Sequence, residues 1–255
     1  MGNIARVGKT VLVTGGGSGI GKAICMAFAA EGAQVACVDR NAQEGTATVE
    51  AIRALGREAL FIAADVSDAA QVQGYVRETR AAFGRIDVFA NNAGIEGAVL
   101  PLTEYPEETF DAVMSVNVRG VFLGLKYVLP VMKEQRSGVV INTGSTGSHV
   151  GSTGVCAYVA SKHAILGLTR CAALEVASFG VRVNAICPGG TRTRMHQSLA
   201  DNRGKVEELA FNLATPNGRI AEPEEIAATV LYMASDHARH MIGQSIILDG
   251  GRLAM

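Results

Sequence analysis

The stretch Thr10-Val-Leu-Val-Thr-Gly-Gly-Gly-Ser-Gly-Ile-Gly21 joins a short β-branched run to a run of helical periodicity. Residues 10–14 are apolar on both faces, which is typical of a strand in a parallel sheet that is covered on both sides. The glycines that follow let the backbone turn sharply before the helix begins. The stretch therefore predicts a βα unit near the start of the fold.

Strand-like and helix-like runs alternate along the rest of the 255 residues. This alternation predicts one doubly wound α/β domain over residues 1–255, with a Rossmann-like seven-stranded parallel sheet and right-handed crossovers. The less regular segment at about 190–216 follows the end of a strand, where a substrate lid would lie. The expected strands are 10–14, 34–39, 59–64, 86–90, 139–143, 182–187 and 245–248. The expected helices are 21–30, 43–55, 69–83, 106–135, 158–179 and 224–235.

The composition argues against several classes of protein. Apolar residues make up 48% and charged residues 18%, and the net charge is −1 without a basic run. Neither disorder nor electrostatic binding to nucleic acid or a membrane surface is expected from these values. No uninterrupted apolar run approaches the roughly 18–20 residues that a membrane span needs. We therefore expect a cytoplasmic protein with no nucleic-acid or membrane partner.

Five cysteines and five histidines lack the spacing of a metal site or a disulfide framework. The odd cysteine count and the absence of CxxC favour reduced thiols, and the apolar surroundings of Cys25, Cys37, Cys171 and Cys187 predict burial. Cys156 lies two residues before Tyr158 and either lines a substrate site or packs internally. The histidines form no HExxH pattern, so no catalytic metal is expected.

The glycine turn Gly15-x-x-x-Gly19-x-Gly21 has the form of a dinucleotide site. Glycine allows a pyrophosphate to approach the backbone, and the N-terminus of the next helix offers free N–H groups and a partial positive charge. About twenty residues later, Asp39 ends the second strand. Its carboxylate can accept hydrogen bonds from ribose hydroxyls and would repel a 2′-phosphate, which favours NAD over NADP. Arg40 follows immediately and could bind that phosphate, so the sequence does not exclude NADP as the cofactor.

Two further strand ends carry polar or small residues. Asp65-Val66 could meet the adenine edge, or Asp65 could cap the following loop. Asn91-Asn-Ala-Gly94 could hold the second ribose and tie neighbouring strand ends together.

Tyr158 and Lys162 are four residues apart and so share one face of a helix, and Ser145 stands thirteen residues before the tyrosine. An isolated tyrosine has a pKa near 10 and is a poor base at neutral pH. An ammonium about 4 Å away, at an effective dielectric near 20, is worth roughly 4 kcal/mol, or about three pKa units. We therefore expect Lys162 to lower the pKa of Tyr158, and Ser145 to hold a substrate oxygen against its hydroxyl.

In their order and spacing these motifs resemble the short-chain dehydrogenase/reductase family over essentially the whole chain. The resemblance rests on Thr14-Gly-x-x-x-Gly19-x-Gly21, Asn91-Asn-Ala-Gly94, Ser145, Tyr158-x-x-x-Lys162 and Pro188-Gly189. It implies that Asn117 holds a water in a proton relay ending at Lys162, and that Lys162 also grips the nicotinamide ribose. It further implies a homotetramer built on the two long helices and the last strand and helix.

The resemblance also implies a full set of site residues. The implied catalytic residues are Asn117, Ser145, Tyr158 and Lys162. The implied cofactor contacts are Gly15, Ser18, Gly19, Ile20, Gly21, Asp39, Asp65, Val66, Asn92, Ala93, Gly94, Tyr158, Lys162, Pro188, Gly189, Thr191 and Thr193.

The expected reaction is NAD-dependent interconversion of a secondary alcohol and its ketone. A looser resemblance to NAD-linked dehydrogenases of cyclic alcohols and diols implies a compact, mostly apolar ring substrate. The alternatives are an NADPH-dependent 3-ketoacyl-thioester reductase and, more remotely, a non-catalytic NAD-binding regulatory protein. Glu96 and His196 are either polar wall residues or solvated. The candidate wall residues are Glu96, Ser145, Thr153, Cys156, Gly189, Met195, His196, Leu199 and Phe211.

Overall fold

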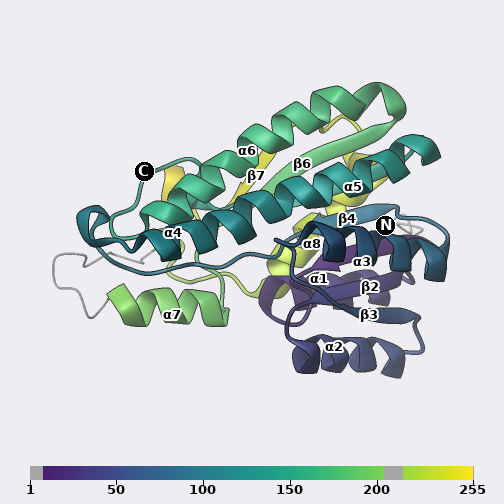
Figure 1. The fold of residues 1–255 in the computed structure, drawn as a ribbon, viewed down its shortest axis with the longest axis horizontal. Helices are drawn as coiled ribbons and strands as arrows, with labels where there is room; N and C mark the ends of the chain where they lie inside the picture. The colour runs from purple at the N-terminus through teal and green to yellow at the C-terminus, as the bar shows by residue number, and fades with distance from the viewer. Residues whose placement is uncertain (1–7, 204–214, 255) are drawn as a thin grey trace.

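A computed structural model describes residues 8–203 and 215–254 of the chain. Seven parallel strands form one sheet in the order β3-β2-β1-β4-β5-β6-β7. The predicted doubly wound sheet is confirmed (Figure 1). The strands are β1 (Thr10–Thr14), β2 (Gln34–Asp39), β3 (Ala59–Ala63), β4 (Val88–Asn91), β5 (Gly138–Thr143), β6 (Val181–Pro188) and β7 (Ser245–Leu248).

The helices form two layers, one on each face of this sheet (Figure 1). Helices α1, α2 and α8 pack on one face, and α3, α5 and α6 pack on the other. The side chains of β1 alternate between the two faces of the sheet. Val11 and Val13 pack with α1, α2 and α8, whereas Leu12 packs with α3, α5 and α6. The helices are α1 (Gly19–Ala30), α2 (Ala42–Ala54), α3 (Ala69–Phe83), α4 (Glu107–Met114), α5 (Gly120–Gln135), α6 (Cys156–Val176), α7 (Arg194–Arg203) and α8 (Pro223–Ala234).

Local sequence signals fix many element ends, and α3 is the clearest case. The Asp68 side chain accepts hydrogen bonds from the backbone N–H groups of Ala70 and Gln71, at 2.8 and 3.0 Å, and so caps the first turn. Gly84 ends the helix with a φ of 78°, a conformation that glycine adopts without strain. The helix covers residues 69–83, as the sequence predicts.

The order of the strands creates a crevice at the carboxyl end of the sheet. β1 lies between β2 and β4, so the chain leaves β1 toward one side of the sheet and later continues from β4 toward the other. Ligands of open α/β sheets bind at such a switch point. The glycine turn after β1 and the Asn91–Gly94 segment after β4 both lie there.

The predicted long helix at 106–135 is a continuous helical segment with a π-helical turn inside it. That turn, Ser115–Arg119, joins α4 to α5 and contains the buried Asn117. Short π-turns of this kind are frequent at functional sites. The segment Glu107–Gln135 is long and apolar enough to cross a membrane, but core helices of soluble proteins meet the same criteria of length and composition. Half of its most apolar 18-residue window is buried inside the protein.

The less regular segment at about 190–216 contains a regular helix within its described part, and its role as a substrate lid stays a prediction. Helix α7 begins at Arg194, and the hydroxyl of Thr193 accepts a hydrogen bond of 3.2 Å from the backbone N–H of His196. A threonine in this position is a helix start signal that the sequence carries. The candidate wall residue Phe211 lies outside the described residues.

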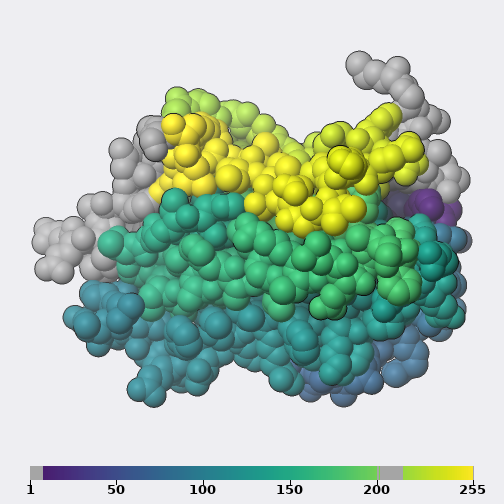
Figure 2. Space-filling view, turned by 90° about the horizontal axis from the view of Figure 1, so that it is seen from above, coloured from purple at the N-terminus to yellow at the C-terminus, as the bar shows by residue number. Residues whose placement is uncertain are grey.

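Three of the four cysteines predicted to be buried are buried, namely Cys25, Cys37 and Cys187. The prediction for Cys171 is wrong, because this residue lies on the outer face of α6 and is exposed. Leu174, three residues further along the same helix, is 81% exposed. In Figure 2, α6 (green) runs over this side of the molecule between α5 (teal) and the C-terminal segment (yellow). The tetramer expected through these helices stays a prediction.

Candidate active site

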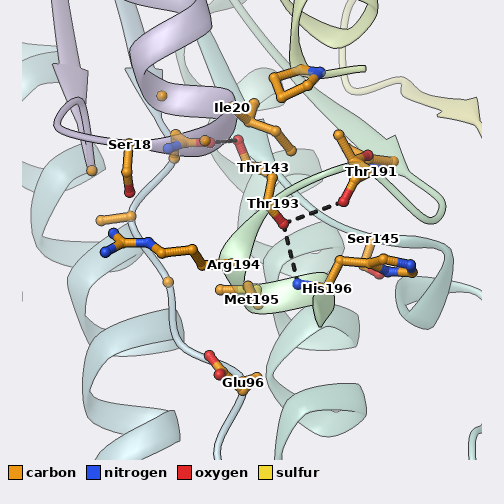
Figure 3. Close-up of a pocket in the computed structure, with 18 of the residues that line it drawn as sticks. Ser18, Ile20, Glu96, Thr143, Ser145, Thr191, Thr193, Arg194, Met195 and His196 are labelled. Carbon is orange, nitrogen blue, oxygen red and sulfur yellow. Dashed lines mark hydrogen bonds between the residues drawn. The ribbon is translucent and has the colours of Figure 1, made fainter. Parts of the chain in front are cut away.

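A groove of about 1370 Å³ runs along the carboxyl ends of the strands. Every predicted catalytic and cofactor residue except Asn117 lines it, and these residues come from the ends of β1, β2, β3, β4, β5 and β6, from the N-terminal turns of α1 and α6, and from the segment before α7. Figure 3 shows Thr143 and Ser145, at and just after the end of β5, together with Thr191, Thr193 and His196 from the segment after β6, all of which line this groove. The topology thus brings residues that are distant in sequence to one site.

The glycine turn forms one end of the groove. A Cβ atom at Gly21 would lie 1.9 Å from the carbonyl oxygen of Gly15, so only glycine allows this close turn. Gly19 opens α1 with a φ of 51°, and a Cβ atom there would lie 3.1 Å from Cγ2 of Thr193, on the opposite wall. The absence of side chains keeps the helix N-terminus open to a phosphate group.

Asp39 stands beside this turn at the end of β2. Its carboxylate accepts hydrogen bonds of 2.8 Å from the backbone N–H of Gly17 and of 2.8 Å from that of Asn41. These bonds fix the carboxylate in the groove wall, where Arg40 is its neighbour. The wall therefore carries both Asp39, whose carboxylate favours NAD, and Arg40, which could bind the 2′-phosphate of NADP.

Asp65 caps the loop that follows β3, which was the alternative role expected from the sequence, and it also lines the groove. One carboxylate oxygen accepts hydrogen bonds from the backbone N–H and the hydroxyl of Ser67, at 2.8 and 2.6 Å. These bonds hold the pKa of Asp65 below its usual range. The loop-capping role and a place beside the adenine are compatible, since Val66 lines the same wall.

The Asn91–Gly94 segment ties β4 to both of its neighbours. The hydroxyl of Thr14, at the end of β1, accepts hydrogen bonds from the backbone N–H groups of Asn92 and Ala93, at 3.0 and 3.1 Å. The side chain of Asn92 donates to the Thr14 carbonyl and accepts from the Thr143 hydroxyl, at 3.1 and 3.2 Å. The predicted strand-tying role is therefore confirmed.

Tyr158 and Ser145 meet at the other end of the groove. The Ser145 side chain lies close enough to the Tyr158 hydroxyl to affect its pKa, and its hydroxyl accepts a hydrogen bond of 3.1 Å from the backbone N–H of Gly147. Burial raises the pKa of Tyr158, the interaction with Ser145 lowers it in part, and the negative charge of Glu96 raises it further. The tyrosine therefore keeps its proton at neutral pH.

Lys162 does not lower the pKa of Tyr158 as the sequence predicts. Its ammonium lies 5.5 Å from the centre of the tyrosine ring and donates a hydrogen bond of 2.8 Å to the carbonyl oxygen of Thr143. Burial lowers the pKa of Lys162 itself to about 8. The expectation was wrong because the helical spacing fixes the shared face, whereas the direction of a long side chain depends on its partners at the end of β5.

Asn117 is buried behind the groove. Its side chain accepts a hydrogen bond of 2.8 Å from the backbone N–H of Ile95 and donates to the carbonyl of the same residue at 2.9 Å. It also donates to the hydroxyl of Ser161 at 3.0 Å. A Cβ atom at Gly94 would lie 3.2 Å from the Asn117 oxygen and 3.6 Å from the Lys162 nitrogen, which puts both polar groups next to this glycine. Asn117 therefore fixes the loop after β4, and its predicted water relay stays a prediction.

The segment after β6 forms the opposite wall. Thr191 pairs with Ala221 as an isolated β-bridge, and the hydroxyl of Thr193 donates to the Thr191 carbonyl at 3.3 Å (Figure 3). Cε1 of His196 lies 3.1 Å from the position that a Cβ atom of Gly190 would take. These contacts hold the start of α7 against the groove.

The candidate substrate wall is partly as predicted. Glu96, Ser145, Gly189, Met195, His196 and Leu199 line the groove, whereas Thr153 and Cys156 do not. Cys156 is the first residue of α6 and is half-buried outside the groove lining. The prediction missed Val155 and Val159, which flank Tyr158 and pack with Leu199. Their closeness to the tyrosine in sequence is the signal that could have found them.

A second feature that the sequence analysis missed is an ion pair between the two walls of the groove. Arg194 of α7 binds Glu44 of α2 through both ends of the guanidinium group, at 2.7 Å each. The residues stand 150 positions apart, and no local pattern connects them.

These residues fit a nicotinamide dinucleotide. Asp39, the glycine cradle and Lys162 all line one groove, where they could bind the adenosine ribose, the pyrophosphate and the nicotinamide ribose of such a cofactor. Within residues 8–203 and 215–254, no cluster of three or more His, Cys, Asp or Glu side chains is arranged to bind a metal ion.

Known proteins are similar to this chain over nearly its whole length. Residues 9–204 match the family model described as short chain dehydrogenase. Levodione reductase of Leifsonia aquatica is 44% identical over 253 residues, covering 96% of this chain and 94% of that protein. The 2,5-dichloro-2,5-cyclohexadiene-1,4-diol dehydrogenase of Sphingobium indicum is 41% identical over 249 residues, covering 97% and 98%.

Solved structures agree with the sequence matches. A crystal structure of levodione reductase superposes with a TM-score of 0.91 at 43% identity, covering 97% of this chain and 98% of the other. A crystal structure of NAD+-bound xylitol dehydrogenase superposes with a TM-score of 0.93 at 34% identity, covering 96% and 99%. This chain is an oxidoreductase that belongs to the short-chain dehydrogenase family.

Proposed function

We propose that the enzyme catalyses the reversible, NAD-linked oxidation of a secondary alcohol to its ketone. The observation that carries this proposal is the meeting of Ser145, Tyr158 and Lys162 at one end of a groove whose other end has the glycine turn and Asp39. A proton-transfer group and a dinucleotide cradle in one cavity are what a hydride-transfer reaction requires.

The dinucleotide, when bound, supplies the hydride chemistry, and the chain supplies its position. Backbone N–H groups at Gly19–Gly21 would bind the pyrophosphate, Asp39 the adenosine ribose, and Lys162 the nicotinamide ribose. Thr191 and Thr193 would hold the carboxamide from the opposite wall.

Tyr158 moves the proton. In the reductive direction its hydroxyl donates to the ketone oxygen, and in the oxidative direction the phenolate accepts the proton of the alcohol. Ser145 holds the same substrate oxygen, so that the proton travels along a preformed hydrogen bond. Because burial raises the pKa of Tyr158, the protonated form that serves reduction is ready at neutral pH.

NAD is the proposed cofactor in preference to NADP. The Asp39 carboxylate is fixed by two backbone N–H groups, so it cannot easily swing away from a 2′-phosphate. Arg40 lines the groove next to it, and this observation keeps the NADPH-dependent 3-ketoacyl-thioester reductase as a second candidate. A non-catalytic regulator is disfavoured, since Tyr158 and Lys162 are both present.

The proposed substrate is a compact alcohol, probed best with ring compounds. Val155, Val159 and Leu199 form an apolar cluster with Tyr158, which suits a hydrocarbon ring. A relative named for a cyclohexadiene diol supports the same choice. We also propose a cytoplasmic homotetramer with small-molecule ligands and neither a nucleic-acid nor a membrane partner.

The test is an initial-rate panel of cyclic and aliphatic secondary alcohols, each with NAD and with NADP at one pH. Turnover of a ring alcohol with NAD is the expected result. Activity confined to NADPH and a 3-ketoacyl thioester would replace the proposal with the second candidate.

A further inference from the structure

Glu96 is a charged residue in the substrate end of the groove that the proposed reaction does not use. It follows the Asn91–Gly94 segment, is half-buried, and lines the groove beside Ile95. Figure 3 shows it on the loop after β4, facing the same cavity as Met195 and Ser145. Within the described part of the chain, Glu96 has neither a hydrogen bond nor an ion pair. Its carboxylate oxygens are therefore available to a ligand.

The backbone on both sides of Glu96 is anchored. On one side, the buried Asn117 binds both the N–H and the carbonyl of Ile95, at 2.8 and 2.9 Å. On the other, Gly97 has a φ of 76°, and a Cβ atom there would lie 2.5 Å from the hydroxyl of Tyr105. That hydroxyl also accepts a hydrogen bond of 3.0 Å from the N–H of Ala98. The carboxylate thus stands on a fixed loop, and its position is part of the shape of the cavity.

The carboxylate lies near the reacting end of the cavity. The charge of Glu96 contributes to raising the pKa of Tyr158, after burial. Part of the same cavity wall is apolar, because Val155, Val159 and Leu199 pack with Tyr158. A substrate group that donates a hydrogen bond would give the Glu96 carboxylate a polar partner within this cavity.

We propose that Glu96 binds a second hydroxyl group of the substrate, so that the enzyme prefers compact diols to alcohols with one hydroxyl group. This inference rests on the proposed dehydrogenase function and narrows its substrate class. Ser145 and Tyr158 hold the reacting oxygen, and Glu96 accepts a hydrogen bond from the other. A charge-assisted bond of this kind gives discrimination that an apolar wall cannot give.

The test compares cyclohexanol with cyclohexane-1,4-diol and 4-aminocyclohexanol as substrates of the full-length enzyme with NAD. The variants are Glu96→Ala, which removes the acceptor, and Glu96→Gln, which keeps an acceptor without the charge. Glu104→Ala and Glu104→Gln are matched controls, since Glu104 is exposed on the same connection and lies outside the groove lining.

We expect the diol-to-cyclohexanol ratio of kcat/KM to fall on the order of tenfold in Glu96→Ala and less in Glu96→Gln. The ratio cancels any change in Tyr158 that affects both substrates equally. Both Glu104 variants should keep the wild-type ratio. A larger loss for the amino alcohol than for the diol would overturn the proposal in favour of an ammonium-binding role.

The pH profile of the reaction distinguishes an effect of Glu96 on Tyr158 from binding of the second hydroxyl group by Glu96. Loss of the Glu96 charge should lower the pKa of Tyr158, so the pH profile of cyclohexanol oxidation should move to lower pH in Glu96→Gln. A shifted profile with an unchanged diol ratio would refute the proposal, because Glu96 would then act on Tyr158 alone. An inactive wild type would refute the proposed function, whereas an active wild type with no change in ratio would refute this inference only.

Discussion

Arg194 and Glu44 form a two-point ion pair across the mouth of the cofactor groove, at 2.7 Å for each contact. Arg194 belongs to the first turn of α7 on one wall, and Glu44 to the first turn of α2 on the other. The position of a Cβ atom on Gly17 would lie 2.9 Å from an oxygen of Asp39 and 3.0 Å from Cβ of Glu44, so the pair stands directly beside the proposed ribose site. The pair therefore connects the start of α7 to the cofactor end of the groove.

Removing this pair should loosen cofactor binding. For Arg194→Gln and Glu44→Gln we expect the dissociation constant of NADH to rise a few-fold, because exposed ion pairs contribute little each. The two effects should be non-additive in the double variant, since each single change breaks the same contact. Titration of NADH fluorescence at low and high salt measures this, and salt should weaken the wild type toward the variants. Fully additive effects would show that the two residues act separately.

Replacing the proposed proton donor should slow turnover by orders of magnitude and leave cofactor binding nearly intact. In Tyr158→Phe the ring still fills its place, but the hydroxyl that exchanges the proton is gone. We expect kcat to fall by about 10²–10⁴-fold, the range that positioned acid–base groups contribute. Tyr232→Phe is the matched control, since Tyr232 is 50% exposed on α8. Retained activity in Tyr158→Phe would remove the tyrosine from the mechanism.

The two directions of the reaction should depend on pH in opposite ways. The pKa of Tyr158 is raised by burial, so its phenolate becomes available only as the pH rises into the alkaline range. Alcohol oxidation should accelerate with increasing pH, and ketone reduction should slow as the proton donor is lost. The pKa of Lys162, lowered to about 8, adds the loss of a positive charge over the same range. Steady-state profiles of kcat/KM in both directions are the measurement, and an oxidation optimum below pH 7 would contradict the assignment.

The sheet was predictable because each strand carries its own signal. Residues 10–14 and 34–39 match β1 and β2 at both ends, since β-branched apolar runs bounded by glycine or charged residues have few alternatives. The predicted start of β4 at Ile86 was two residues early, because Ile86 is buried although it precedes the strand. Burial and strand pairing are separate properties, and hydropathy reports only the first.

The features that the sequence did not reveal depend on long side chains and on distant partners. The direction of the Lys162 ammonium is decided by the carbonyl of Thr143, and the Arg194–Glu44 pair depends on how the fold places the first turns of α7 and α2. Cys171 shows the same limit on one helix, because an apolar sequence around it did not reveal that its face of α6 points outward. Local patterns fix elements, whereas the packing of elements fixes which face meets solvent.

Asp39 should determine the choice between the two dinucleotides. In Asp39→Asn the charge that repels a 2′-phosphate is lost, while the amide oxygen can still accept a hydrogen bond from the N–H of Gly17. Arg40 then faces the phosphate without a competing carboxylate beside it. We expect the ratio of kcat/KM for NADP over NAD to rise on the order of tenfold, which corresponds to about 1.4 kcal/mol. Asp111→Asn, a change of the same kind at an exposed position of α4, should leave the ratio unchanged. An unaltered ratio in Asp39→Asn would mean that Arg40 or another group in the groove sets the preference.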